Sequence, residues 1–162
     1  TKPVDPLPRP TPAPMTSFVI SAQKVLQGKT LAAGEFTFEL RDSQGNVIDT
    51  AKNAADGRVS FGARRTGNAG TYLYTIAEVK GQDAGITYDA GVWQVRAVVK
   101  EAGGKLTASL DYLKDGTPYE TATFTNSYLL PATGDAAPAT IAALLALSVL
   151  LWMYSRKRKA EV

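Results

Sequence analysis

The segment Gly-Thr-Tyr-Leu-Tyr-Thr-Ile-Ala-Glu-Val, residues 70–79, indicates the fold class of this chain most plainly. Tyr72, Tyr74, Ile76 and Glu78 are two residues apart, so in an extended strand their side chains share one face. Aromatic and β-branched residues, which favour strands, make up most of the segment. We therefore interpret residues 71–79 as a half-buried β-strand that carries one carboxyl group on its apolar face.

Similar short runs of alternation extend on both sides of this strand, from residue 17 to residue 128. Glycine-containing turns separate them, and Gln44-Gly45-Asn46 and Asp56-Gly57 are typical of hairpins. No run of ten or more residues shows the helical period. The pattern predicts about nine short strands in an all-β fold, an antiparallel immunoglobulin-like β-sandwich. The clearest of these strands are expected at residues 17–26, 35–40, 47–50, 59–61, 71–79, 92–99, 106–112 and 121–128.

Three polar side chains fall in phase with apolar neighbours in these strands: Lys24, Glu78 and Asn126. Burying a lysine or a carboxylate alone is costly, so each needs a partner, and the simplest partners are one another. Singly, each has an ordinary alternative. Lys24 could extend its ammonium group to water, Glu78 could pair with a surface lysine, and Asn126 could cap a turn. Their joint occurrence favours a common site.

Placed together in an apolar site, these three groups have the chemistry to form a covalent bond. Desolvation favours the neutral amine of Lys24 and the protonated carboxyl of Glu78. The amine is a nucleophile, and the carboxamide carbon of Asn126 is an electrophile. Glu78 would act as the catalytic group, hydrogen-bonding the carboxamide oxygen and relaying a proton to departing ammonia. The expected product is an autocatalytic, intramolecular Lys24–Asn126 isopeptide bond.

Several motifs around these residues resemble those of a known family. They are Gln23-Lys24-Val25-Leu26-x-Gly28, Leu31-x-Ala33-Gly34-Glu35-Phe36-Thr37-Phe38-Glu39-Leu40, Gly70-Thr71-Tyr72-x-Tyr74-Thr75-Ile76-x-Glu78-Val79, Gly85-Ile86-Thr87-Tyr88 and Phe124-Thr125-Asn126. Together they look like the streptococcal pilin isopeptide-linkage domain, the module of major-pilin shafts, over residues 17–128. The resemblance implies that Lys24 in the first strand and Asn126 in the last form the bond, and that Glu78 catalyses it.

The end of the chain, residues 129–162, has a different composition. Leu130-Pro131-Ala132-Thr133-Gly134 precedes an uncharged apolar run, residues 136–154, and a basic tail, residues 155–162. As a helix the run would span roughly 28 Å, close to the ~30 Å hydrocarbon core of a bilayer. Because the cations follow it, we expect a transmembrane helix with its C-terminus in the cytoplasm.

This order of motif, apolar helix and basic tail resembles the cell-wall sorting signal of Gram-positive LPXTG surface proteins. The resemblance implies that a sortase cleaves between Thr133 and Gly134 and links Thr133 to a peptidoglycan precursor. It also implies a secreted protein that spans the membrane only transiently and ends covalently attached to the cell wall. An ordinary C-terminal membrane anchor is the simpler alternative.

The first residues, 1–16, form a proline-rich segment that contains six of the nine prolines. Alternating proline favours extended polyproline II structure, so we expect a semi-rigid linker or stalk rather than part of the sandwich. No signal peptide opens the chain, although the C-terminal signal implies export. We therefore expect a processed product or the C-terminal fragment of a longer protein.

Charge and composition exclude several function classes. The chain carries +3, but residues 134–162 hold four of its 18 cations and two of its 15 acids, which leaves +1 for the rest. We therefore expect no nucleic-acid partner. There is no histidine and no cysteine, which removes Ser-His-Asp and Cys-His catalysis and nearly all zinc sites. We expect no metal, no cofactor and no enzymatic activity beyond single-turnover bond formation.

These features predict a structural protein, a wall-anchored stalk or pilus (fimbrium) component. One alternative is an adhesin that binds a host ligand through tyrosines such as Tyr88, Tyr112 and Tyr119. The other is a polymerising shaft subunit with other pilus subunits as partners. The shaft family usually presents its acceptor lysine in a Trp-x-x-x-Val-x-Val-Tyr-Pro-Lys type motif, and residues 93–100 lack the Tyr-Pro, which favours a stalk or anchor.

Overall fold

In the computed structural model, residues 13–129 are described, and they form twelve β-strands. The strands are β1 (Thr16–Phe18), β2 (Ser21–Gln27), β3 (Thr37–Arg41), β4 (Val47–Lys52), β5 (Arg58–Ser60), β6 (Arg64–Thr66), β7 (Gly70–Glu78), β8 (Ile86–Thr87), β9 (Val92–Ala102), β10 (Lys105–Lys114), β11 (Thr117–Tyr119) and β12 (Ala122–Tyr128). Within residues 13–129, no helix is long and apolar enough to cross a membrane. The predicted sorting motif 130–134, transmembrane helix 136–154 and basic tail 155–162 lie outside the described residues, as does most of the linker.

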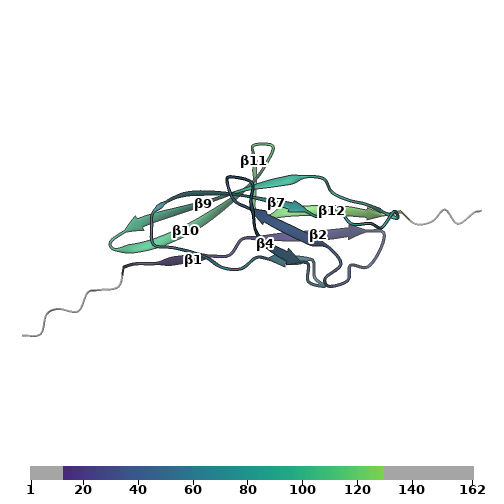
Figure 1. Ribbon diagram of the computed structural model, residues 1–162, viewed down its shortest axis with the longest axis horizontal. Coiled ribbons are helices and arrows are strands. Elements are labelled where there is room, and N and C mark those ends of the chain that lie inside the picture. Colours follow the sequence, from purple (N-terminus) through teal and green to yellow (C-terminus); the bar gives the residue numbers. More distant parts are fainter. Residues whose placement is uncertain (1–12, 130–162) are drawn as a thin grey trace, which may run out of the picture. The chain divides into compact units, whose positions relative to one another are not determined.

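The strands form two main sheets and a small third one (Figure 1). The six-stranded sheet has the order β11-β10-β9-β7-β3-β4, the four-stranded sheet has the order β5-β2-β12-β8, and β1 pairs with β6. The all-β fold predicted from the alternation is therefore confirmed. One pair of described strands departs from the predicted antiparallel arrangement, because β2 and β12 run parallel. A parallel pair is possible there because β2 and β12 are far apart in the sequence and are not joined by a hairpin.

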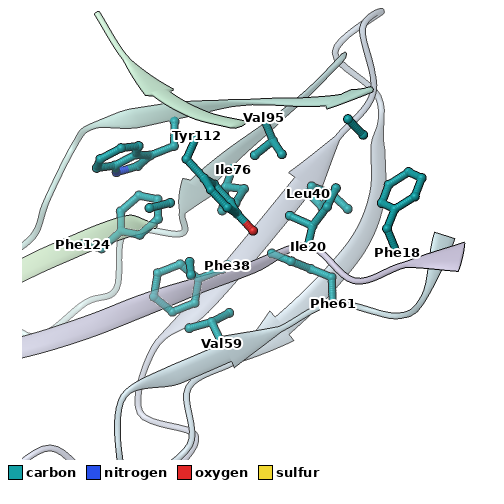
Figure 2. Packing of buried hydrophobic residues seen from close by; sticks show 14 of the residues in the cluster. Phe18, Ile20, Phe38, Leu40, Val59, Phe61, Ile76, Val95, Tyr112 and Phe124 are labelled. Atoms are coloured by element: carbon teal, nitrogen blue, oxygen red, sulfur yellow. The ribbon is translucent and has the colours of Figure 1, made fainter. Parts of the chain in front are cut away.

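The core lies between the two main sheets and contains the predicted inward faces (Figure 2). Phe38 of the six-stranded sheet packs on Phe124 of the four-stranded sheet, with ring centroids 5.2 Å apart. The fully buried apolar side chains include Ile20, Phe38, Leu40, Val59, Ile76, Ala97, Ala122 and Phe124. Apart from Ile20, which lies between β1 and β2, these residues belong to strands of the two main sheets, and burial alternates along those strands with the two-residue period of the sequence.

The predicted strand 17–26 is two strands in the structure, β1 and β2. Phe18, Ile20 and Ala22 are all buried, so the alternation is unbroken. The pairing changes, however, because β1 joins β6 in the small sheet and β2 joins the four-stranded sheet. Alternation reports which face a side chain occupies and not which strand it pairs with. The three short strands β6, β8 and β11 were also not predicted.

The turn at Asp56-Gly57 does not join a hairpin, which corrects the interpretation from the sequence. The strands on its two sides, β4 and β5, belong to different sheets. The turn is tight, with Gly57 at φ +84° and its N–H donating to the Ala54 carbonyl at 3.0 Å. It places β5 beside β2, and the Gly57 carbonyl accepts the N–H of Lys24 at 2.7 Å. The turn thereby fixes the backbone of β2 at Lys24.

Candidate functional site: a buried lysine, glutamate and asparagine

Lys24 and Asn126 are positioned by the parallel pairing of β2 and β12. Lys24 lies opposite Phe124, and Asn126 is two residues further along β12, so both side chains point to the same face of the four-stranded sheet. That face is the core face. Lys24 is 1 % exposed and Asn126 is fully buried, which makes both of them polar residues within the apolar layer.

Glu78 approaches from the facing sheet. It is the last residue of β7 and lies opposite Phe38 of β3. Its Oε2 is 2.6 Å from Lys24 Nζ, and its Oε1 accepts a hydrogen bond from Asn126 Nδ2, also at 2.6 Å. The side chains of Lys24 and Glu78 have no exposed surface. The structure thus brings together the three residues singled out from the sequence, with the carboxyl group bridging the two nitrogens.

The surroundings of Lys24 disfavour its charged form. The side chain is shielded from water, which removes the hydration that stabilises an ammonium group, although the Phe36 ring, 4.6 Å from Nζ, attracts a cation. Burial lowers the pKa of Lys24 from its ordinary value of 10.5, and this effect outweighs the hydrogen bond and charge of Glu78 and the charge of Asp89, which act in the opposite direction. The neutral, nucleophilic amine is therefore more accessible here than on a lysine in water.

One detail differs from the expectation for Glu78. The sequence argument placed its carboxyl group on the carboxamide oxygen of Asn126, whereas in the structure it contacts the carboxamide nitrogen. The oxygen, Oδ1, instead accepts the backbone N–H of Asp89 at 2.7 Å. Because a backbone N–H can only donate, it fixes the orientation of the carboxamide and turns Nδ2 towards Glu78. Sequence reasoning missed Asp89, since every residue other than proline carries this donor.

The three tyrosines considered for an adhesive surface differ in their exposure. Tyr112 is buried in the core, and its hydroxyl accepts the N–H of Ser21. Tyr88 packs against Phe36 at 6.1 Å between ring centroids. Tyr119 is half exposed, and its ring packs edge-on against a tryptophan of β9. All three rings therefore pack against other residues of the domain, and Tyr112 is not available at the surface.

Comparison with known families identifies the class of protein. Residues 20–129 match the family FctA, described as a Spy0128-like isopeptide containing domain. Because the match spans more than half of the chain, the chain belongs to this family of Spy0128-like isopeptide containing domains.

Solved structures of major pilins from Streptococcus pyogenes are similar to this chain. One has 14 % sequence identity and a TM-score of 0.45, with 69 % of this chain and 50 % of that chain covered. Two more, from different serotypes, have 13 % and 18 % identity and TM-scores of 0.48 and 0.46, and each match covers 72 % of this chain and 54 % of the pilin. The chain thus aligns with about half the length of the pilins it matches. A search of curated proteins found no match.

Proposed function

We propose that this protein is a structural component of a Gram-positive cell surface, a stalk or pilus component, locked by an isopeptide bond between Lys24 and Asn126. One observation carries the proposal: the two nitrogens that must exchange a proton contact opposite oxygens of one buried carboxyl group. Membership of an isopeptide-containing family supports it independently. If Lys24 and Glu78 formed only a structural ion pair, the pair would not require the carboxamide of Asn126 beside it.

The geometry supports the following sequence of steps. Glu78 takes a proton from the Lys24 ammonium group, which leaves a neutral amine and a protonated carboxyl. The amine attacks Cγ of Asn126, a C–N bond forms, and the carbonyl electron pair moves to Oδ1. The second amine proton passes through the carboxyl group of Glu78 to Nδ2. The Cγ–Nδ2 bond then breaks, ammonia departs, and Glu78 remains protonated.

Intact mass of the full chain tests the bond. We expect the wild type to lack the mass of one ammonia and Glu78→Ala to have the full mass. Glu35→Ala is a matched control, because Glu35 also pairs with a lysine, Lys29 at 3.1 Å, but near the surface. This control should retain the deficit. A wild type of full mass, with tryptic peptides containing Lys24 and Asn126 that separate freely, would refute the cross-link.

The proposal extends to wall attachment, with sortase and a peptidoglycan precursor as partners. It is supported by the order of the motif 130–134, the apolar run and the basic tail. In a sortase-containing Gram-positive host, wild type should leave the cell only after the wall is digested with a muramidase. Thr133→Ala should remain in the membrane fraction. Membrane retention of both proteins would instead indicate an ordinary membrane anchor.

A stalk and a polymerising subunit differ in the size of the wall-linked species that they form. Lys100 is exposed on β9, within the strand that lacks the Tyr-Pro of the shaft motif. We expect a single wall-linked species on a denaturing gel after muramidase digestion. A sortase-dependent ladder of high mass would show polymerisation with other pilus subunits, and its loss in Lys100→Ala would identify the acceptor.

A further inference from the structure

We propose that the backbone N–H of Asp89 is the oxyanion donor for isopeptide formation, and that the Asp89 carboxylate is a positioning group that holds this N–H in place. The inference rests on the proposed function, because it concerns the same reaction. It adds to the site a fourth element, the loop between β8 and β9, which is separate from the three strands that carry the side chains.

The backbone N–H of Asp89 contacts the atom on which negative charge develops during the reaction, Oδ1 of Asn126. The Asp89 N–H is 2.7 Å from Oδ1 of Asn126, within the range of a well-formed hydrogen bond. When the amine adds to Cγ, the carbonyl electron pair moves onto Oδ1, and a donor already in place stabilises this charge more than it stabilises the neutral carboxamide. Glu78 is not available for this task, because both of its oxygens contact nitrogens.

The side chain of Asp89 holds its own backbone against β12. One carboxylate oxygen accepts the N–H of Thr125 at 3.0 Å, the residue immediately before Asn126. The other accepts the N–H of Gly91 at 2.8 Å, which closes the loop. The loop and the strand are therefore joined in both directions, since Asp89 donates to Asn126 and accepts from Thr125.

The charge of this carboxylate does not itself favour the reaction. It acts to raise the pKa of Lys24, against the effect of burial, and so favours the unreactive ammonium form. A negative group near a developing oxyanion is also unfavourable. If Asp89 acted through its charge, removing it would speed bond formation. If it acts by positioning a donor, removing it slows bond formation, so the sign of the effect separates the two roles.

The first test follows the rate of ammonia loss in the full-length chain, isolated uncross-linked in denaturant with detergent and then refolded. Asp89→Ala should slow ammonia loss at least about tenfold. Asp89→Asn keeps one acceptor oxygen, so its rate should lie between those of Asp89→Ala and wild type. The control is Asp42→Ala. The Asp42 carboxylate also accepts two backbone N–H groups, from Gln44 and Asn46, but in the β3–β4 turn. The Asp42→Ala variant should therefore lose ammonia at the wild-type rate.

The second test removes only the N–H. Replacing residue 89 by the α-hydroxy analogue of aspartate, introduced by chemical ligation, turns the amide into an ester and keeps the carboxylate. We expect the reaction to slow about 10²-fold or more. The same exchange at residue 42 is the control, because its N–H donates to the Asn46 carbonyl at 3.0 Å, away from the site. It should leave the rate unchanged.

The outcomes distinguish this inference from the proposed function. If wild type loses no ammonia, the proposed function fails. If wild type reacts but the ester at position 89 reacts as fast as wild type, the cross-link stands and the oxyanion role of Asp89 is refuted. Equal slowing by the esters at positions 89 and 42 would also refute it, because the effect would then be one of general stability.

Discussion

Lys24 and Glu78 form an ion pair with no exposed side-chain surface, and its energetic role is separable from that of the cross-link. In an Asn126→Ala background no bond can form, but the pair remains. Adding Glu78→Gln there leaves a buried amine without its anion, so we expect the free energy of unfolding in urea to fall by about 3–5 kcal/mol. Glu35→Gln in the same background, at a more exposed pair, should cost less than about 1 kcal/mol. Equal losses would contradict burial of the pair.

The lowered pKa of Lys24 predicts a pH dependence of stability in the same background. Since the folded-state pKa lies below the ordinary value of 10.5, the unfolded chain binds more protons between those two pH values. The free energy of unfolding therefore rises with pH in that window. The measurement is the difference in stability between Asn126→Ala and Asn126→Ala/Lys24→Met as pH approaches 10.5, which cancels the titrations of groups that do not interact with Lys24. A difference independent of pH would show that Lys24 titrates as it does in water.

Side-chain positions at the site were accessible from sequence, whereas the backbone contribution was not. Lys24 and Asn126 stand out because a polar residue in an apolar alternation is an exception that needs a reason. Asp89 follows the short strand β8 in a loop, and its contribution is a backbone N–H, so nothing in its side chain marks the role. The orientation of the Asn126 carboxamide depends on that donor and was therefore also missed.

Among the elements, the turn at residues 54–57 has the most direct link to the site. Gly57 lies at φ +84°, and a Cβ there would be 2.2 Å from the Lys24 carbonyl oxygen. Gly45 is a matched control, with φ +86° and no atom within 4 Å of such a Cβ. In the Asn126→Ala background, Gly57→Ala and Gly45→Ala should each lower the free energy of unfolding by about 1–2 kcal/mol, because alanine is strained in the left-handed conformation.

Gly57→Ala should cost about 1–3 kcal/mol more than that, because β5 must move away from β2. Urea unfolding measures both losses. In the otherwise wild-type chain, Gly57→Ala should also slow ammonia loss after refolding, since Lys24 shifts with the strand. Equal losses of stability at the two glycines would show that the turn does not constrain β2.

The sequence predicts pairing between neighbouring strands better than pairing between strands that are far apart in the chain. The hairpin β3–β4 joins neighbouring runs across the turn at Gln44-Gly45-Asn46 and was predicted correctly. The pairing of β2 with β12 joins residues about 100 positions apart, and no local signal specifies it or its parallel direction. The long-range pairings are fixed by packing of the whole core, which single runs of alternation do not encode.

For the whole domain, the parallel pairing of its first and last long strands sets how force passes through it. Pulling on the start of β2 and the end of β12 shears the two strands along their length, which loads their hydrogen bonds together. A Lys24–Asn126 bond would join these strands directly, so the residues between them would lie outside the load path. In the chain-entropy account, closing a loop of roughly 100 residues also stabilises the fold by about 4.7 kcal/mol.

This load path predicts the response to pulling in a single-molecule force experiment. Asn126→Ala should unfold with an added length of roughly 330–360 Å, the contour length of the roughly 100 residues between positions 24 and 126. Wild type should show no such step, because the covalent bond bypasses those residues. Glu78→Ala should extend like Asn126→Ala, since both lack the bond, and Glu35→Ala should behave as wild type. Unfolding of wild type with the full added length would mean that force does not pass through a Lys24–Asn126 link.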